Sequence, residues 1–168
     1  MGRSWHAENM RAVVQRAVDA NVTVDGHVLG EFSGPGLVIL VGVTHTDTHA
    51  TAVKLADKIY GLRIFDQEFI RPFDQVCVPP NSPRELSLGE LGLPVVVISQ
   101  FTLYGSTKKG RRPTWDAAAP GPVAEPLVDA VAQRFRELGT EVATGKFGAD
   151  MQVSLINSGP MTLIVDVE

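Results

Sequence analysis

The chain has 168 residues with a hydrophobic fraction of 44% and a charged fraction of 20%, values typical of one globular domain with a buried core. No apolar run approaches the ~18 residues of a membrane-spanning helix, and the polar start lacks the apolar stretch of a signal peptide. The single cysteine, Cys77, excludes a disulfide within the chain and any site built from several cysteines. These properties indicate a cytoplasmic protein. The net charge of −4 argues against nucleic-acid binding over the whole surface.

Patterned sequence begins at Met10, so we expect an extension over residues 1–9 and a single domain over 10–168. Residues 11–26 predict a strand, a short link and a second strand, ending in the hairpin-turn dipeptide Asp25-Gly26. A return strand over 27–32, a loop, and a buried strand over 36–43 are expected next.

The period then changes from that of a strand to that of a helix. Ala52, Leu55, Ala56, Ile59 and Leu62 share one helical face between positions 45 and 61. Thr46, Asp47 or Thr48 can cap the start of this helix, and Gly61 suits its end. A short strand follows over 63–66. The proline-rich stretch 67–94 predicts a long surface excursion within the same domain.

In the second half, residues 94–101 predict a strongly buried strand, and 102–113 a loop. A second helix is expected over 125–138, with Pro126 in its first turn and Gly139 at its end. The chain should finish with strands over 141–144, 151–156 and 161–167. The sum is an α+β fold: one domain whose β-sheet or partial barrel is covered by two main helices.

Familiar catalytic motifs are missing. Ser99 lies at a strand end, where a nucleophile could sit, but no G-x-S-x-G elbow surrounds it and no histidine is placed to act as its base. His45, Asp47 and His49 could suggest a metal site, although a helix entrance is commonly rich in such residues for capping. There is no P-loop and no dinucleotide fingerprint.

Polar residues in unusual places remain as candidates. Ser99, Gln100 and Thr102 end an aliphatic strand, as an ordinary polar strand end would. The segment 157–160, Asn-Ser-Gly-Pro, interrupts an apolar pattern and has the composition of a hairpin turn. A compact basic cluster could bind a few phosphates or be a solvated loop. Its members are Lys108, Lys109, Arg111 and Arg112.

Five segments are similar to one known family, and the two motifs among them, SQFT at 99–102 and NSGPMT at 157–162, occur in its order and spacing. The five segments are MRAVVQRA at 10–17, RIF at 63–65, SQFTLYG at 99–105, KKGRRPTW at 108–115 and TGKFGADMQVSLINSGPMT at 144–162. Together they closely resemble the D-aminoacyl-tRNA deacylases, over nearly everything from Met10 to the end of the chain. The resemblance implies hydrolysis of the ester in D-aminoacyl-tRNA by a homodimer whose active site lies at the subunit interface. It implies no metal and no organic cofactor.

The resemblance also implies roles for single residues. Ser99, Gln100, Phe101 and Thr102 match the motif beside the ester. Phe147 and Met151 match residues near the bound aminoacyl-adenosine. With tRNA as substrate, we expect the basic cluster to contact its phosphates, because these charges are concentrated on an otherwise acidic protein. Gly159 and Pro160 match a Gly-cis-Pro pair that enters the partner's pocket and rejects L-amino acids sterically, with Arg16 supporting that loop. Glycyl-tRNA, which has no side chain to reject, should be cleaved.

Two departures from the family pattern stand out. The family's Gly-Lys-Met-Asn-like stretch after RIF is replaced here by the unrelated residues 69–90, and residues 1–9 have no counterpart. Two other functions remain open. One is a small-molecule esterase with Ser99 or Thr102 as covalent nucleophile, and the other is a tRNA-binding or protein-binding module without turnover.

Overall fold

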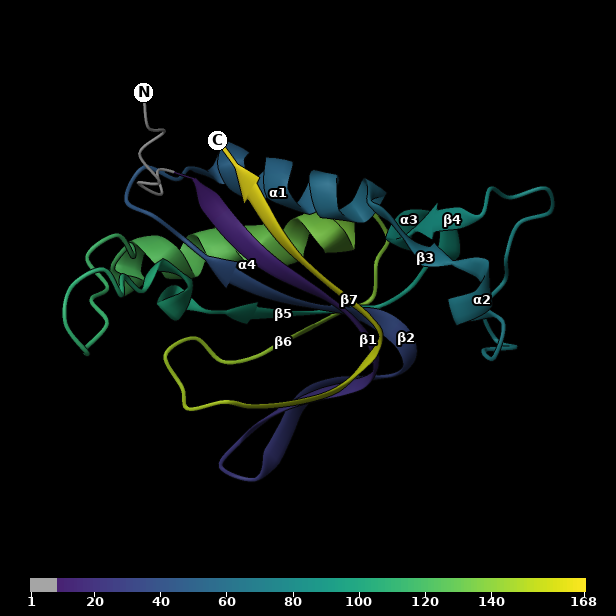
Figure 1. Ribbon diagram of the computed structural model, residues 1–168, viewed down its shortest axis with the longest axis horizontal. Coiled ribbons are helices and arrows are strands. Elements are labelled where there is room, and N and C mark those ends of the chain that lie inside the picture. The colour runs from purple at the N-terminus through teal and green to yellow at the C-terminus, as the bar shows by residue number, and fades with distance from the viewer. Residues whose placement is uncertain (1–8) are drawn as a thin grey trace.

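The computed structural model describes residues 9–168, in which a curved sheet carries two long helices on one face (Figure 1). A small second sheet and two short helices lie at one end of this layer pair. In chain order the elements are β1 (Met10–Val24), β2 (His27–Gly42), α1 (His49–Gly61), β3 (Arg63–Asp66), α2 (Gln67–Ile70), β4 (Glu85–Ser87), α3 (Leu88–Leu91), β5 (Val95–Ser99), η1 (Phe101–Tyr104), α4 (Gly121–Glu137), β6 (Val142–Thr144) and β7 (Gln152–Val167).

The main sheet has the strand order β6-β5-β2-β1-β7. β1 is antiparallel to both β2 and β7, whereas β2, β5 and β6 are parallel to one another. The sheet curls so strongly that a Cβ on Gly30 of β2 would come within 2.7 Å of the Ala143 side chain in β6. The predicted α+β fold with a sheet or partial barrel under two main helices is confirmed.

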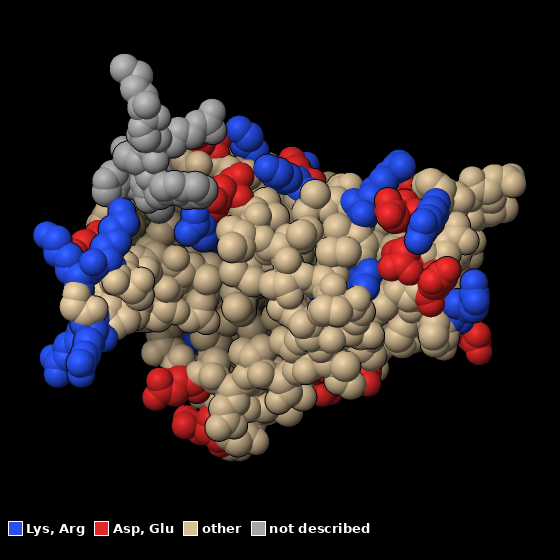
Figure 2. Space-filling view, in the orientation of Figure 1, with Lys and Arg blue, Asp and Glu red and all other residues tan. Residues whose placement is uncertain are grey.

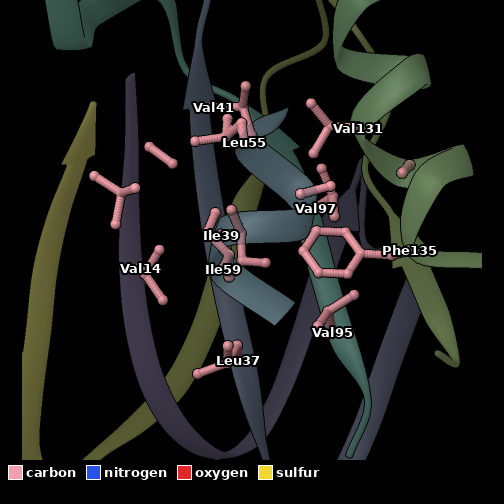
Figure 3. Packing of buried hydrophobic residues seen from close by; sticks show 14 of the residues in the cluster. Val14, Leu37, Ile39, Val41, Leu55, Ile59, Val95, Val97, Val131 and Phe135 are labelled. Carbon is pink, nitrogen blue, oxygen red and sulfur yellow. The ribbon is translucent and has the colours of Figure 1, made fainter. Parts of the chain in front are cut away.

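The main core lies between the sheet and the two helices (Figure 3). Leu55 and Ile59 of α1 and Val131 and Phe135 of α4 are fully buried against the strands. Strand residues that alternate along the sequence supply the opposite wall, because successive side chains point to opposite faces of a sheet. These strand residues include Val14, Leu37, Ile39, Val41, Val95 and Val97.

The helix expected between 45 and 61 is confirmed as α1, and its cap is Thr48. The Thr48 side chain accepts a hydrogen bond from the Thr51 N–H, and the Thr51 hydroxyl accepts one from the Thr48 N–H, as in a capping box. The 67–94 stretch is more structured than predicted. It forms α2, β4 and α3, and places Ile70, Leu86 and Leu88 in the core.

The first half of the sheet corrects two predictions. The predicted link in 11–26 and the predicted loop at 33–36 are both absent, because β1 and β2 are continuous strands. Asp19, at φ +52°, and Gly34, at φ +75°, form facing irregularities instead. The Asp19 carboxylate accepts a hydrogen bond of 2.7 Å from the Gly34 N–H. The polar residues therefore mark a bulge that bends the hairpin without ending the strands.

Two boundaries in the second half also differ. α4 begins at Gly121, four residues before the expected start, so Pro126 lies inside the helix and not in its first turn. β7 runs without interruption from Gln152 to Val167, and the hairpin-turn interpretation of 157–160 is wrong. Gln15 pairs with Thr162 and Ala17 with Asn157, so the longer stretch of β7 between these pairs bulges away from β1.

Candidate active site

A pocket of about 260 Å³ opens where the parallel strands β2, β5 and β6 end. The carboxyl ends of parallel strands are a common place for ligand binding, since the chain there leaves the sheet in loops that enclose a space. Val41 and Ser99 come from the strand ends, Phe101 opens η1, and Phe147 follows β6. Gln100 also lines the pocket. Three of the four residues of the SQFT motif, Ser99, Gln100 and Phe101, therefore lie around one pocket together with Phe147.

The opposite wall of the pocket was not predicted from the sequence. It consists of small or apolar residues before and within α4, namely Ala119, Gly121, Ala124 and Val128. Alanine and glycine carry no chemical signal in a sequence, and only the unexpectedly early start of α4 brings them here. No lining residue is an acid, a base or a cysteine, so the pocket offers polar contacts without a general base.

The start of η1 supplies backbone N–H groups close to Ser99 in the chain. Phe101 and Thr102 are its first residues, and the first N–H groups of a helix have no partner within it. Gln100 precedes them without capping them through its side chain. The Gln100 amide instead donates to the Thr102 hydroxyl, which orders the two polar side chains of the motif. Thr102 lies next to the pocket but does not line it.

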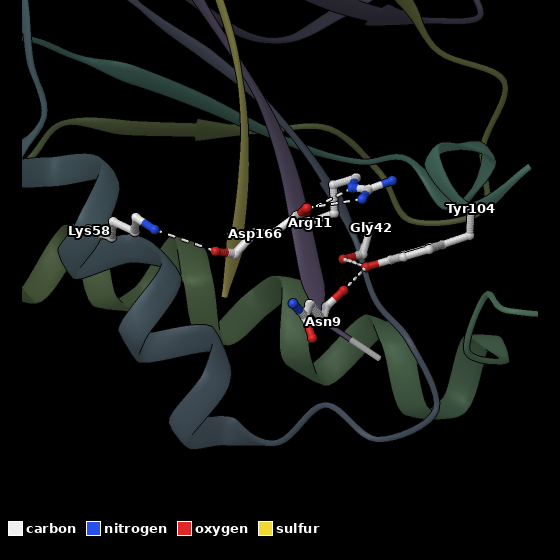
Figure 4. A network of polar contacts seen from close by, with 6 residues as sticks. All are labelled: Asn9, Arg11, Gly42, Lys58, Tyr104 and Asp166. Atoms are coloured by element: carbon white, nitrogen blue, oxygen red, sulfur yellow. Dashed lines mark hydrogen bonds and ion pairs between the residues drawn. The ribbon is translucent and has the colours of Figure 1, made fainter. Parts of the chain in front are cut away.

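Tyr104 anchors the other end of η1 to the sheet (Figure 4). Its hydroxyl lies 2.5 Å from the carbonyl oxygen of Asn9 and 3.2 Å from that of Gly42. Burial raises the pKa of Tyr104, with the Asp47 carboxylate adding to the shift, so the hydroxyl stays protonated as a donor. Nearby, Arg11 of β1 forms a two-point ion pair with Asp166 of β7 at 2.7 and 3.0 Å.

The loop after η1 carries the basic cluster as a short hairpin. Ser106 and Thr114 exchange backbone hydrogen bonds of 2.8 and 3.0 Å and close this hairpin. The basic side chains between them, from Lys108, Lys109, Arg111 and Arg112, are all exposed. Figure 2 shows lysine and arginine gathered at this end of the molecule.

Arg16 lies in a different part of the sheet and is only 4% exposed. Its guanidinium donates to the carbonyl oxygen of Ile64 at 2.9 Å, to the Asp66 carboxylate at 3.0 Å and to the carbonyl oxygen of Ser158 at 3.3 Å. The ring of Phe69 covers the guanidinium, with the Arg16 Cζ atom 4.2 Å from the ring centroid. Phe69 belongs to the stretch that departs from the family pattern, so this replaced stretch contacts the predicted loop-supporting arginine.

The predicted cis bond between Gly159 and Pro160 is wrong for this structure, in which no peptide bond of residues 9–168 is cis. Both residues are exposed and lie in the bulged part of β7, with Gly159 at φ +109°. The extended course of β7 along β1 accommodates the bulge with a trans bond. Gly159 also faces Arg16 so closely that a Cβ there would collide with the guanidinium. Neither residue lines the pocket of its own chain.

Met151 does not join the pocket either. It packs beside Val22 and Leu155 in a second apolar cluster, on the other face of the sheet. The His45-Asp47-His49 cluster is not a metal site: Asp47 accepts from the Thr44 N–H at 2.7 Å, and the His45 ring contacts the Asp116 carbonyl at 2.8 Å. In residues 9–168, no three His, Cys, Asp or Glu side chains lie close enough together to bind a metal ion. None of the helices in this part of the chain is long and apolar enough to span a membrane.

Comparison with known proteins identifies the family. A family model described as D-Tyr-tRNA(Tyr) deacylase matches residues 13–166. The chain belongs to this deacylase family. D-aminoacyl-tRNA deacylases from Cutibacterium acnes and Nocardia farcinica are 52% and 55% identical to it. These alignments cover 95% and 94% of this chain, and 98% and 99% of the relatives.

Solved structures share the deacylase fold. One, described as the c-Myc DNA Unwinding Element Binding Protein, has a TM-score of 0.77 and 31% identity over 94% of this chain and 99% of its own. A probable eukaryotic D-amino acid tRNA deacylase has a TM-score of 0.76 over 95% of this chain and 100% of its own. Its identity is only 16%, so that likeness shows the fold alone.

Proposed function

We propose that this deacylase hydrolyses the ester between a D-amino acid and the terminal adenosine of tRNA, releasing both. One observation carries the proposal: the family's SQFT motif lines a pocket together with Phe147, in a chain about half identical to D-aminoacyl-tRNA deacylases. The reaction would take place in the cytoplasm, where aminoacylated tRNA is used.

The pocket supports a mechanism in which the substrate supplies part of the catalysis. A water molecule adds to the ester carbonyl carbon, helped by the ribose hydroxyl next to the ester. The N–H groups of Phe101 and Thr102 donate to the oxyanion that forms. When the carbon–oxygen bond to the ribose breaks, the leaving oxygen takes up the proton lost by water. The protein mainly positions the ester, which fits a pocket without acids or bases.

The proposed homodimer follows from surfaces that one chain leaves uncovered. β7 is an edge strand, and its Ile156 and Ile164 side chains are 56% and 70% exposed. The pocket of about 260 Å³ is below the ~300–1,000 Å³ of pockets that enclose drug-sized ligands. It would therefore enclose only part of an aminoacyl-adenosine. We propose that the Gly159-Pro160 segment of a second copy completes the enclosure.

Selection of the D-form would then be steric. Both enantiomers offer the same groups, so a rigid obstacle separates them more readily than attraction does. The backbone at Gly159 has no side chain of its own and is held at Ser158 by Arg16. We propose that it blocks the direction taken by an L side chain, with no need for a cis bond. Glycyl-tRNA presents no side chain and would be cleaved.

The decisive experiment compares three substrates on the same tRNA, charged with a D-amino acid, its L-enantiomer or glycine. We expect release of the D-amino acid and glycine and persistence of the L-ester. Equal cleavage of D- and L-esters contradicts steric selection. Tight tRNA binding without release of any amino acid would instead support a binding module.

A second experiment separates substrate-assisted catalysis from a covalent nucleophile. D-aminoacyl-tRNA ending in 2′-deoxyadenosine should be a far poorer substrate, while Ser99→Ala and Thr102→Ala should each keep measurable activity. Removal of a triad nucleophile costs roughly a million-fold in turnover. A loss of that size in either variant, with a burst of acyl-enzyme in the unmodified protein, would establish the esterase alternative.

A further inference from the structure

Two large aromatic side chains stand exposed at the rim of the pocket. Phe101 is 56% exposed and Trp115 is 41% exposed. Their rings meet edge to face, with centroids 5.6 Å apart and planes at 79°. Large aromatic groups are usually buried, so a pair left in solvent beside a candidate active site indicates a binding surface.

The position of Trp115 is fixed by its neighbours. The indole lies against the backbone of Gly105, where a Cβ would come within 2.6 Å of it. The Ser106–Thr114 hairpin closes directly before Trp115, and the Trp115 carbonyl accepts a hydrogen bond of 2.9 Å from the Ala118 N–H. The ring is therefore presented by a rigid backbone, so little conformational entropy is lost when a ligand covers it.

The order of chemical groups outward from the pocket is informative. Phe101 is both a lining residue and the partner of Trp115, and the basic hairpin 107–113 immediately precedes Trp115 in the chain. A ligand that follows this path meets a small pocket, then aromatic faces, then positive charge. Single-stranded nucleic acid has the complementary order, because its bases are flat and apolar and its phosphates are negative.

We propose that Trp115, together with Phe101, forms a stacking platform for the unpaired bases that precede the terminal adenosine of tRNA. This site rests on the proposed function, since it assumes that the terminal adenosine occupies the neighbouring pocket. Trp115, which does not line the pocket, adds a contact to tRNA that is independent of the amino acid and does not touch the ester. Trp115 is thus a residue for binding tRNA and not for chemistry.

The first test compares two substrates in Trp115→Leu, which keeps an apolar side chain but removes the aromatic face. A base stacked on an aromatic ring contributes ~1–3 kcal/mol. For D-aminoacyl-tRNA we therefore expect kcat/KM to fall roughly ten-fold to a hundred-fold. For D-aminoacyl-adenosine, which lacks the preceding bases, the fall should be at least ten times smaller. Trp115→Phe should restore part of the loss.

Val123→Ala provides the matched control, since Val123 is also 41% exposed and does not line the pocket. It should treat the two substrates alike. Equal losses with both substrates in Trp115→Leu, or no loss with either, would overturn the platform. An unmodified protein that cleaves neither substrate would contradict the proposed function instead.

A binding measurement tests the platform without catalysis. The chain has two tryptophans, so Trp5→Phe leaves Trp115 as the sole indole emitter. We expect the trinucleotide CCA to quench this emission much more strongly than adenosine alone. Equal quenching by both would contradict stacking of the preceding bases. Emission that is shielded from added quencher and changes with protein concentration would show that a second copy of the chain covers Trp115.

Discussion

The pocket and the Arg16 region are built from opposite kinds of contact. The pocket has apolar walls, and its backbone donors at Phe101 and Thr102 open a helix without a side-chain cap. Around Arg16, a buried cation is bonded to two carbonyls and a carboxylate and covered by a ring. The first region leaves groups available to a substrate, whereas the second uses its groups to fix a backbone segment. The proposed chemistry and the support of the Gly159 segment thus depend on different parts of the sheet.

The largest effect is expected when Arg16 is removed. Arg16→Ala removes the hydrogen bonds from Arg16 to the Ser158 and Ile64 carbonyls and leaves Asp66 without its ion-pair partner. It should lower the free energy of unfolding by about 3 kcal/mol, the lower end for a broken buried pair because Asp66 is partly exposed. Urea denaturation measures the change. Ser99→Ala in the pocket should change stability far less. A similar loss in both variants would remove the contrast between the two regions.

Arg63→Ala is the matched control for this change. The Arg63 side chain is 59% exposed and has a single ion-pair contact with Glu90 at 3.5 Å. Since exposed ion pairs contribute little, its effect on unfolding should be small.

Replacement of Gly159 should give the next largest effect. Gly159→Ala places a Cβ at φ +109° and into the Arg16 guanidinium. Gly139→Ala also has a positive φ, +87°, but nothing lies within 4 Å of its Cβ. Both variants should lose about 1–2 kcal/mol from the backbone conformation. Only Gly159→Ala should lose more than that and also weaken discrimination between D- and L-aminoacyl-tRNA, which is measured as the ratio of deacylation rates.

A pH titration addresses the charge next to Arg16. Burial acts to raise the pKa of Asp66, but the Phe69 N–H and the Arg16 guanidinium outweigh it and hold this pKa below its ordinary value. A lowered folded pKa stabilises the protein above the unfolded pKa and ceases to do so as the pH falls through the folded value. Asp66→Asn retains a helix-capping side chain. The stability advantage of the unmodified protein over this variant should be full above about pH 5 and shrink below about pH 4.

A difference that stays constant down to about pH 2 would show that the ion pair does not account for the effect of Asp66→Asn.

The smallest effect is expected from the basic hairpin. Lys108→Gln combined with Lys109→Gln should raise the KM for D-aminoacyl-tRNA a few-fold and reduce its log–log salt dependence by about 1.5, since each phosphate contact contributes ~0.7–0.9. Lys54→Gln combined with Lys58→Gln on α1 is the control and should leave the salt dependence unchanged. A fall in kcat with unaltered salt dependence would argue against phosphate binding.

Local pattern was sufficient where an element depends on its own residues. α1 and its Thr48 cap follow from helical spacing and capping chemistry. Local pattern was insufficient where the conformation of a segment depends on the strand paired with it. Asp19 and Gly34 look like chain breaks in the sequence, but each is accommodated because the other lies across from it. The bulge near Gly159 has the same origin, since pairing with β1 continues on both sides of it.

The candidate site shows the same limit. The motif residues Ser99, Gln100, Phe101 and Phe147 were expected together, and they line one pocket. The wall from α4 could not be expected, because alanine and glycine give no signal of contact with a ligand. Met151 belongs to the same matched segment as Phe147, and both lie in the loop between β6 and β7, yet Met151 packs against the other cluster.

The pairing of β1 with β7 has a consequence for synthesis on the ribosome. Arg16 is made early and its acceptor Ser158 is made 142 residues later, so the two can meet only after nearly all of the described chain has emerged. Domains fold as units while they are translated, and contacts between distant residues form late because long loops must close first. The β1–β2 hairpin can therefore form before Gly159 and Pro160 are in place. The element proposed to sense handedness is the last part of the sheet to join.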